Sequence, residues 1–474
     1  MRRCSPARGA FLFFLAAAAC AGDLAPGRVT EKVVCREQPA QSYALYLPPA
    51  YTADRRWPIL YLLDARGRAL VPVERFREAA ATYGWILASS YDSRSDTKDD
   101  PNTPALQAMW RDTHALLAID ERRAYLSGFS GGARASVAIA LAAPKAIAGV
   151  IGCGAGLHDD RVSLDGLPFR YFGTAGDSDF NYYEMRDLAA RLAAAKAPGR
   201  VEYFAGGHDW PPPDLAAEAI AWMETEAMKS GARSRDEALV ASLHARDLAR
   251  ADTLAAQGRR TEAFLRYARV AEDYRGLADV EVEQARAADL GRSRAVRKAL
   301  DDAKSRDDAD RAAIRAIARK LNAALASSEP AASAAVAAQL GIPALRRRAA
   351  SDSPEERLSA ERILANLRVQ SSFYLPEELL AKKDWAHARL SLEVAAAIDP
   401  DDPLAYYNLA CAAARAGQVG RTLADLQGAV DKGFRSFAMI DGDPDFAAVR
   451  ADPKFRAWLE KARTGAGAPT PSAP

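Results

Sequence analysis

The segment RAYLSGFSGG, residues 123–132, decides the fold of this chain. Its first seven residues predict a buried strand, and the helix-forming residues after Gly132 predict a helix. Between the two, Ser130 is flanked by Gly128, Gly131 and Gly132. A serine held between glycines on a sharp strand-to-helix turn presents its hydroxyl group for attack. The segment therefore predicts a nucleophilic serine and hydrolytic chemistry, with an ordinary serine in a tight turn as the alternative.

Short apolar runs alternate with helical patterns on both sides of this segment. The predicted strands are residues 42–47, 58–63, 85–90, 123–129, 149–154, 169–173 and 200–204, and the predicted helices are 71–82, 104–117, 131–142, 182–195 and 215–228. Strands that are apolar throughout are typical of a parallel sheet covered on both faces. The pattern predicts an α/β fold with a doubly wound, mostly parallel sheet over residues 30–230.

The second half of the chain has a different residue composition and a different hydrophobic pattern. After about Gly231 there are no strand-like runs, and alanine, arginine, leucine and acidic residues recur at helical spacing, which predicts an all-α domain over residues 231–463. Small and apolar residues at 369–434 resemble two consecutive tetratricopeptide repeats, with a weaker trace at 244–276; the alternative is an alanine-rich bundle. Residues 464–474, which are mostly small residues and proline, are expected to be disordered.

Composition excludes several classes of protein. The chain has 474 residues, which favours two or more domains, and 64 basic against 62 acidic side chains give a formal charge of +2. Nothing in that balance indicates a nucleic-acid partner. Cys35, Cys153 and Cys411 are scattered without metal-ligand spacing, so we expect buried single thiols, no structural metal and no cofactor.

The first 22 residues have the pattern of an export signal. Arg2 and Arg3 precede an apolar run at 11–15 and small residues at 16–19, and this run is too short to span a bilayer. Cys20 resembles the acylated cysteine of a bacterial lipoprotein, although Ala17 replaces the customary leucine. This pattern predicts either lipidation of Cys20 or ordinary removal of the export signal by signal peptidase. The expected location is the periplasm or, through a lipid on Cys20 as the only membrane contact, the cell envelope.

A serine nucleophile needs a base and an acid that orients the base. His208, in the segment GGHDW at 206–210, follows the last predicted strand and is the expected base. The segment between Gly173 and Tyr182 offers two acids, of which Asp179 is favoured because it leads directly into a helix, with Asp177 as the alternative. A loop histidine without a role remains the competing interpretation.

The predicted sharp turn at Ser130 and the order Ser130, Asp179, His208 resemble the α/β-hydrolase superfamily, in particular its esterase, polyhydroxybutyrate-depolymerase-like and prolyl-oligopeptidase-like branches. The resemblance covers about residues 30–228. It implies an acyl-enzyme mechanism, in which Ser130 attacks a carbonyl and His208 carries the proton.

The same resemblance places further residues around the site. One oxyanion donor should be the Gly131 N–H, and the second should come from the loop after the 58–63 strand, at Ala65 or Arg66. Tyr91, Arg94 and Trp210 are candidate substrate contacts, although each could instead stabilise its own loop.

Together these features predict an exported hydrolase that acts on a small-molecule or polymer ester, with helical repeats that bind a protein partner or position the enzyme. A peptidase of prolyl-oligopeptidase type and a non-catalytic envelope scaffold are the alternatives. Ester and amide hydrolysis use the same nucleophile, base and oxyanion site, so residue types alone do not separate them.

Overall fold

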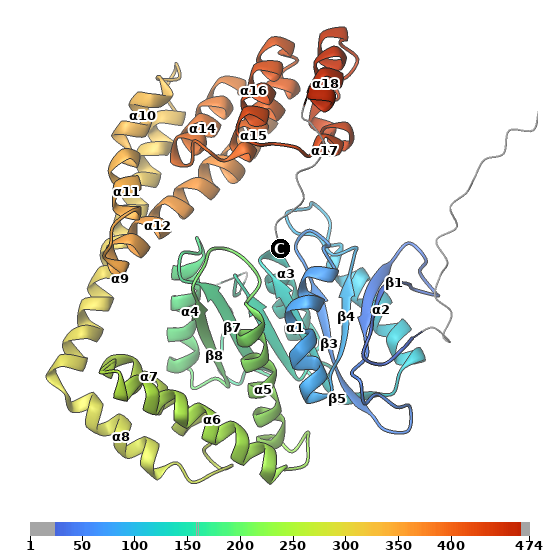
Figure 1. Cartoon of the computed structure of the whole chain (residues 1–474), viewed down its shortest axis with the longest axis vertical. Coiled ribbons are helices and arrows are strands. Elements are labelled where there is room, and N and C mark those ends of the chain that lie inside the picture. The colour runs from blue at the N-terminus through green and yellow to red at the C-terminus, as the bar shows by residue number, and fades with distance from the viewer. Residues whose placement is uncertain (1–23, 158, 160, 466–474) are drawn as a thin grey trace, which may run out of the picture.

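A computed structural model describes residues 24–157, 159 and 161–465 of the chain (Figure 1). The predicted export signal, including Cys20, and most of the predicted C-terminal tail lie outside these residues. Within the described ranges, no helix combines the length and the apolar character needed to cross a membrane.

The first half of the chain forms an eight-stranded sheet with the order β1-β2-β4-β3-β5-β6-β7-β8. The strands are β1 (Val29–Val34), β2 (Ser42–Tyr46), β3 (Trp57–Leu63), β4 (Ile86–Ser90), β5 (Ile119–Phe129), β6 (Gly149–Cys153), β7 (Arg170–Gly176) and β8 (Gly199–Phe204). All neighbours from β4 to β8 pair in parallel, whereas β2 pairs antiparallel with both β1 and β4. The predicted doubly wound, mostly parallel sheet is confirmed.

Five helices cover the two faces of the sheet, and they are α1 (Leu70–Tyr83), α2 (Asn102–Leu116), α3 (Gly131–Ala142), α4 (Tyr182–Ala194) and α5 (Pro213–Lys229). Strand β3 shows how the faces divide, because successive side chains of a strand point to opposite sides. Ile59 and Tyr61 pack in the core beneath α2, α3 and α4, whereas Leu60 and Leu62 pack in the core beneath α1 and α5.

The second half of the described chain is helical, as predicted. Its elements are α6 (Glu237–Ala256), α7 (Arg260–Asp273), α8 (Glu281–Arg292), α9 (Arg294–Leu325), α10 (Ser333–Gln339), α11 (Ile342–Ala349), α12 (Pro354–Val369), η1 (Gln370–Tyr374), α13 (Leu375–Ala381), α14 (Trp385–Ile398), α15 (Pro403–Arg415), α16 (Val419–Asp431), α17 (Phe437–Gly442), η2 (Pro444–Phe446) and α18 (Pro453–Gly465). Helix α18 continues into the first residues of the predicted tail. In Figure 1 these helices run beneath the sheet domain, rise beside it along α9, and return above it from α12 onward.

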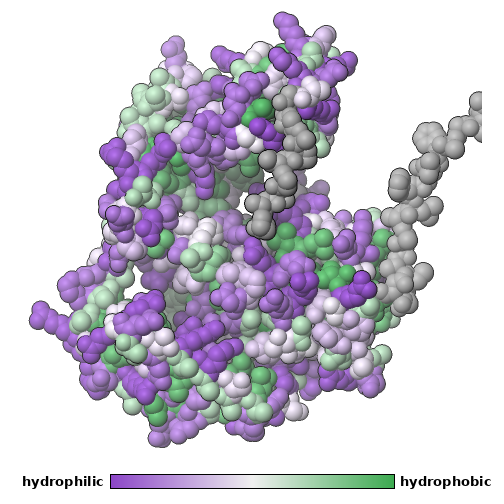
Figure 2. All heavy atoms as spheres, in the orientation of Figure 1, coloured by the Kyte–Doolittle hydropathy of each residue, from purple (hydrophilic) through white to green (hydrophobic). Residues whose placement is uncertain are grey.

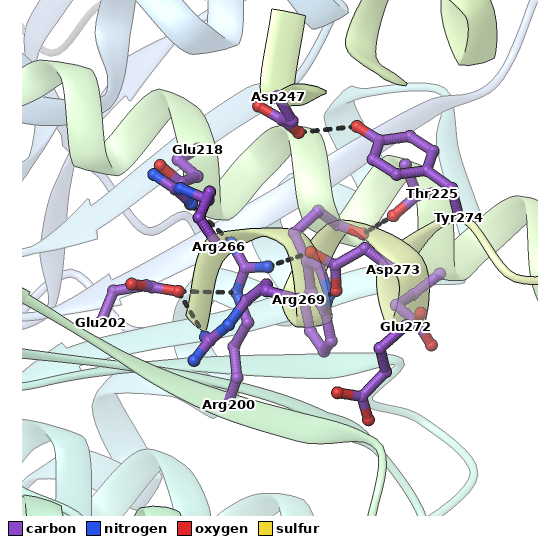
Figure 3. A network of polar contacts seen from close by, with 12 residues as sticks. Arg200, Glu202, Glu218, Thr225, Asp247, Arg266, Arg269, Glu272, Asp273 and Tyr274 are labelled. Carbon is purple, nitrogen blue, oxygen red and sulfur yellow. Dashed lines mark hydrogen bonds and ion pairs between the residues drawn. The ribbon is translucent and has the colours of Figure 1, made fainter. Parts of the chain in front are cut away.

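A buried ionic network joins the helical half to edge strand β8 (Figure 3). Arg200 of β8 is ion-paired with Glu218 of α5 at 2.6 Å and with Asp273 of α7, and its side chain is only 10% exposed. Arg266 of α7 also pairs with Glu218, at 3.0 Å. Burial by itself raises the pKa of Glu218, but Arg200 and Arg266 outweigh it and hold that pKa below its ordinary value. The network therefore fixes α7 against the sheet domain.

Candidate active site

Ser130 occupies a strained turn at the carboxyl end of β5. Its backbone has φ 55° and ψ −121°, and α3 begins at the next residue. Positive φ is uncommon for a residue with a side chain and persists only where the surroundings enforce it. Here the Ser130 N–H donates to the Cys153 carbonyl at 2.8 Å, which ties the turn to neighbouring strand β6. The structure therefore places Ser130 on the predicted sharp turn between a strand and a helix.

The glycines around Ser130 are required by close backbone contacts. A Cβ atom on Gly128 would lie 2.1 Å from the Gly132 carbonyl oxygen, and one on Gly132 would lie 2.1 Å from the Leu63 carbonyl oxygen. On Gly131 it would lie 2.1 Å from Cβ of Ser95. Any side chain at these positions would force the backbone segments apart, so the tight turn requires glycine at all three positions.

His208 and Asp179 form a hydrogen-bonded pair beside this turn. Nδ1 of His208 lies 2.9 Å from each carboxylate oxygen of Asp179, whose side chain is completely buried, whereas the histidine side chain is 18% exposed. The Asn181 N–H also donates to Asp179, at 2.7 Å. Asp177, the alternative acid, instead accepts a hydrogen bond from the Gly206 N–H at 3.0 Å. The geometry thus favours Asp179 as the residue that orients the imidazole.

Two aromatic rings enclose the imidazole of His208. The ring centroids of Phe129 and Phe180 lie 4.6 Å and 4.2 Å from that of His208. With Nδ1 held by Asp179, Nε2 is the ring nitrogen available to a nucleophile. Among the described residues, no hydrogen bond yet joins the Ser130 hydroxyl to His208, and such bonds commonly tighten only when substrate is bound.

Backbone N–H groups for an oxyanion are present near Ser130. The Gly131 N–H lies in the first turn of α3, where a helix offers its own N–H groups no acceptor. In the loop after β3, the Arg66 N–H donates to Asp64 Oδ1 at 2.8 Å. No backbone hydrogen bond engages the Ala65 N–H within the described chain. Of the two predicted alternatives for the second donor, the Arg66 N–H is therefore occupied by Asp64, whereas the Ala65 N–H is left available.

The buried carboxylate of Asp64 links the oxyanion loop to the histidine loop. It accepts hydrogen bonds from Arg68 Nη2 and from Trp210 Nε1, both at 2.9 Å. Burial raises the pKa of Asp64, but these donors and two backbone N–H groups outweigh burial and lower it overall. Trp210 is only 1% exposed and packs on Phe76. These contacts correspond to the loop-stabilising alternative for Trp210, because the indole lies beneath the surface and holds the two loops together.

Tyr91 and Arg94 also serve their own loop. The Tyr91 hydroxyl donates to the Glu31 carbonyl at 2.7 Å, which turns the side chain toward β1. Arg94 donates to the carbonyls of Tyr91 and Ser93, at 2.7 Å and 2.6 Å. These contacts correspond to the loop-stabilising alternative, and neither side chain is brought to Ser130 by any hydrogen bond within the described residues.

The helical half of the chain reaches the acid loop, which the sequence did not predict. Arg362 of α12 donates from Nε to the Asp177 carbonyl at 2.6 Å, and its guanidinium carbon lies 3.8 Å from the ring centroid of Tyr182. Close by, the Tyr183 hydroxyl donates to Asp310 of α9 at 2.6 Å. A contact between residues 185 positions apart leaves no local pattern in the chain.

The three cysteines that the structure describes are buried and unpaired, as predicted. Burial raises the pKa of Cys153 to about 12, so its thiol is inert at neutral pH. Cys411, Asp443 and Asp445 group their ligand atoms within 4.8 Å of one another. However, Asp443 already accepts a hydrogen bond from the Tyr407 hydroxyl at 2.7 Å and caps the turn at Asp445, so this group has a structural explanation.

The strand order and the turn at Ser130 define an α/β-hydrolase fold for the first half of the chain. No protein-family model matches the sequence, and no curated protein matches it. Among solved structures, the fluorophosphonate-binding serine hydrolase F of Staphylococcus aureus is 15% identical with a TM-score of 0.32 and covers 39% of this chain and 92% of its own. An esterase of Rhizomucor miehei is 16% identical with a TM-score of 0.35, and the match covers 44% of this chain and 87% of the esterase. An esterase of Pyrobaculum calidifontis is 11% identical with a TM-score of 0.35, and the match covers 44% of this chain and 88% of the esterase. Likenesses this distant do not define an activity.

Proposed function

We propose that this protein is a serine hydrolase that cleaves carboxylic esters through an acyl-enzyme on Ser130. The observation that carries the proposal is the convergence of three loops at the carboxyl edge of the sheet. One holds Ser130 in a strained turn, and the other two hold His208 and Asp179 at 2.9 Å from each other. An isolated serine hydroxyl is a poor nucleophile, so a positioned imidazole beside it is the chemical requirement for acyl transfer.

Each residue has a defined task in the proposed reaction. The Ser130 oxygen attacks the ester carbonyl while His208 Nε2 takes the hydroxyl proton. Asp179 stabilises the imidazolium that results. The negative charge on the carbonyl oxygen is met by the N–H groups of Gly131 and Ala65. His208 then returns the proton to the departing alcohol, and water releases the acyl group by the same route in reverse.

Covalent labelling with a fluorophosphonate tests the assignment of Ser130. The wild-type protein should be labelled, and Ser130→Ala should not be. Ser127→Ala is a matched control, because Ser127 lies on the same strand with its hydroxyl bonded to the Ile151 carbonyl at 2.8 Å. Equal labelling of wild type and Ser130→Ala would remove Ser130 from the mechanism.

The preference for an ester over an amide belongs to the same proposal and needs its own measurement. The purified protein should hydrolyse acyl esters faster than peptidyl amides of matched acyl group, and His208→Ala should abolish both activities. A faster amide reaction would instead identify a peptidase of prolyl-oligopeptidase type. No turnover of either class would support a binding scaffold built on a hydrolase fold.

We also propose that the protein is exported and that its helical half positions the enzyme or binds a protein partner. The support is the charged and apolar pattern of residues 1–22, together with the repeat-like spacing at 369–434. Mass spectrometry of the mature N-terminus tests the first part. A diacylglyceryl group on Cys20 would establish a lipid anchor, and a free N-terminus beyond residue 20 would exclude it.

A further inference from the structure

The peptide unit between Asp64 and Ala65 is held from its carbonyl side. Its carbonyl oxygen accepts a hydrogen bond from the Ser93 hydroxyl at 2.8 Å and a second from the Gly67 N–H at 3.1 Å. The described residues contain no cis peptide bond, and in a planar trans unit the carbonyl and the N–H point in opposite directions. The two donors therefore fix the direction of the Ala65 N–H. Donation to the carbonyl also polarises the unit and strengthens its N–H as a donor.

Ser95, two residues after Ser93, contacts both segments that supply the proposed oxyanion donors. Its N–H donates to the Ala65 carbonyl at 3.0 Å. It also packs on the turn that follows Ser130, because a Cβ atom on Gly131 would lie 2.1 Å from Cβ of Ser95. The loop of Ala65 and the turn of Gly131 thus lie against the same residue.

The segment 93–95 is itself anchored by Asn102, the first residue of α2. The Asn102 side chain donates from Nδ2 to the Arg94 carbonyl at 2.8 Å, and its Oδ1 accepts from the Arg94 N–H at 3.2 Å. Asn102 is buried, so water competes little for these bonds. One amide therefore holds both backbone groups of Arg94, which places Ser93 and Ser95 on either side of a fixed residue.

Ser93 lies too deep to touch a substrate. In Figure 2 the surface of the molecule is hollowed between the upper helices and the sheet domain below them. Ser93 reaches neither this hollow nor any other open surface, because its side chain is completely buried. It acts on a bound ester only through the peptide unit that it holds.

We propose that Ser93 is a positioning residue for the oxyanion hole, with a buried hydroxyl that aims the Ala65 N–H at the oxygen of the ester carbonyl. This inference rests on the proposed function, because it adds a residue to the reaction at Ser130. In the step concerned, the Ser130 oxygen bonds to the carbonyl carbon, an electron pair of the C=O bond moves to the oxygen, and the hydroxyl proton passes to His208. Ser93 exchanges neither protons nor electrons and changes only how well the negative oxygen is stabilised.

An ester and a transition-state analogue test the proposal together. Ethyl acetate gives kcat and KM, and 1,1,1-trifluoroacetone adds to the serine oxygen without a leaving group, so its Ki reports affinity for the oxyanion. Ser93→Ala should lower kcat about 10- to 100-fold, less than the roughly 10²–10³-fold loss of an entire donor, and raise Ki by a similar factor. KM should stay within about twofold of wild type. A merely structural role would reduce the amount of folded enzyme and leave Ki unchanged.

Ser391→Ala is the matched control, because Ser391 is also completely buried and donates to the Ser371 carbonyl at 2.9 Å within the helical half. This variant removes the same kind of bond and should change neither kcat nor Ki. Asn102→Ala releases the segment 93–95 from another side and should change kcat and Ki together, as Ser93→Ala does. It provides the same test if Ser93→Ala is too unstable to purify.

Unchanged kcat in the two variants, or a lower kcat with an unchanged Ki, would overturn the role of Ser93. Turnover of ethyl acetate and fluorophosphonate labelling of the wild type would leave the hydrolase intact in that case. Absence of both in the wild type would overturn the proposed function and the role of Ser93 with it.

Discussion

The Nε atom of Arg362 donates a 2.6 Å hydrogen bond to the carbonyl of Asp177, and this bond connects the helical half of the protein to the loop that carries the candidate catalytic acid. Asp177 lies two residues before Asp179, and its carboxylate in turn holds the Gly206 N–H of the histidine loop. The helix is therefore coupled through a single loop to both members of the histidine–aspartate pair.

Removal of this contact should weaken catalysis more than stability. Arg362→Ala frees the acid loop, and a displacement of about 1 Å at a catalytic group can cost about 100-fold in rate. We expect kcat to fall by about 10- to 100-fold while KM for ethyl acetate changes little. Arg311→Ala is the matched control, because Arg311 pairs with Asp187 at 2.7 Å and donates to the Tyr183 carbonyl at 3.1 Å, so that both of these partners lie in α4 and not in the acid loop. Equal losses in both variants would mean that Arg362 only docks the domain.

The two acids of the loop are separated by isosteric substitution. Asp179→Asn removes the charge that stabilises the imidazolium and should lower kcat by about 10⁴-fold, as for a serine triad that loses its acid. Asp177→Asn retains an oxygen that can accept from the Gly206 N–H, so its kcat should stay within about threefold of wild type. A large loss in Asp177→Asn with a small loss in Asp179→Asn would reverse the assignment.

Trp210 should matter for stability through its bond to Asp64. Trp210→Phe leaves a buried carboxylate short of one donor, which costs about 1–3 kcal/mol of unfolding free energy. The measurement is urea denaturation of wild type, Trp210→Phe, Asp64→Asn and the double variant. If the two side chains act together, the double variant should lose less than the sum of the single losses. Additive losses would show that the indole stabilises the fold by packing alone.

Acid should loosen the ionic network of Figure 3 before it affects the sheet. The folded-state pKa of Glu218 is lowered, so its contribution is present above the ordinary glutamate value of about 4.3 and is lost as pH falls toward the folded value. Thermal unfolding at a series of pH values should show a smaller acid-induced decrease in Tm for Glu218→Gln than for wild type. Glu262→Gln, which removes an exposed pair with Arg259, should follow the wild-type curve.

The elements around Ser130 could be predicted because their signals are local. An apolar strand, glycines that permit a tight turn and a run of helix formers occupy consecutive residues, so the turn at Ser130 was found without knowledge of its neighbours. His208 was located for the same reason, since glycines precede it after a strand. Edge strand β1 was missed, because its residues are mostly half-buried or exposed and carry no continuous apolar run.

Other features depended on which way a side chain faces. Trp210 lies two residues after His208 in the chain, yet its indole turns inward to a carboxylate 146 residues away. The choice between Ala65 and Arg66 required knowing which backbone N–H the Asp64 side chain occupies. The contact of Arg362 with the acid loop depends on how a distant helix docks, and composition and spacing do not encode that docking.

The ionic network at Arg200 has a consequence for how this protein can be divided. The Arg200 guanidinium has one carboxylate partner in α5 and another in α7, which lie on opposite sides of the predicted boundary near residue 231. A chain cut after α5 would retain every strand, yet it would also retain a desolvated cation that has lost part of its neutralising charge, and a Tyr183 hydroxyl without its acceptor. We therefore expect the sheet half to fold less stably when it is expressed alone, because residues of α7 and α9 supply the partners of Arg200 and Tyr183 at its outer edge.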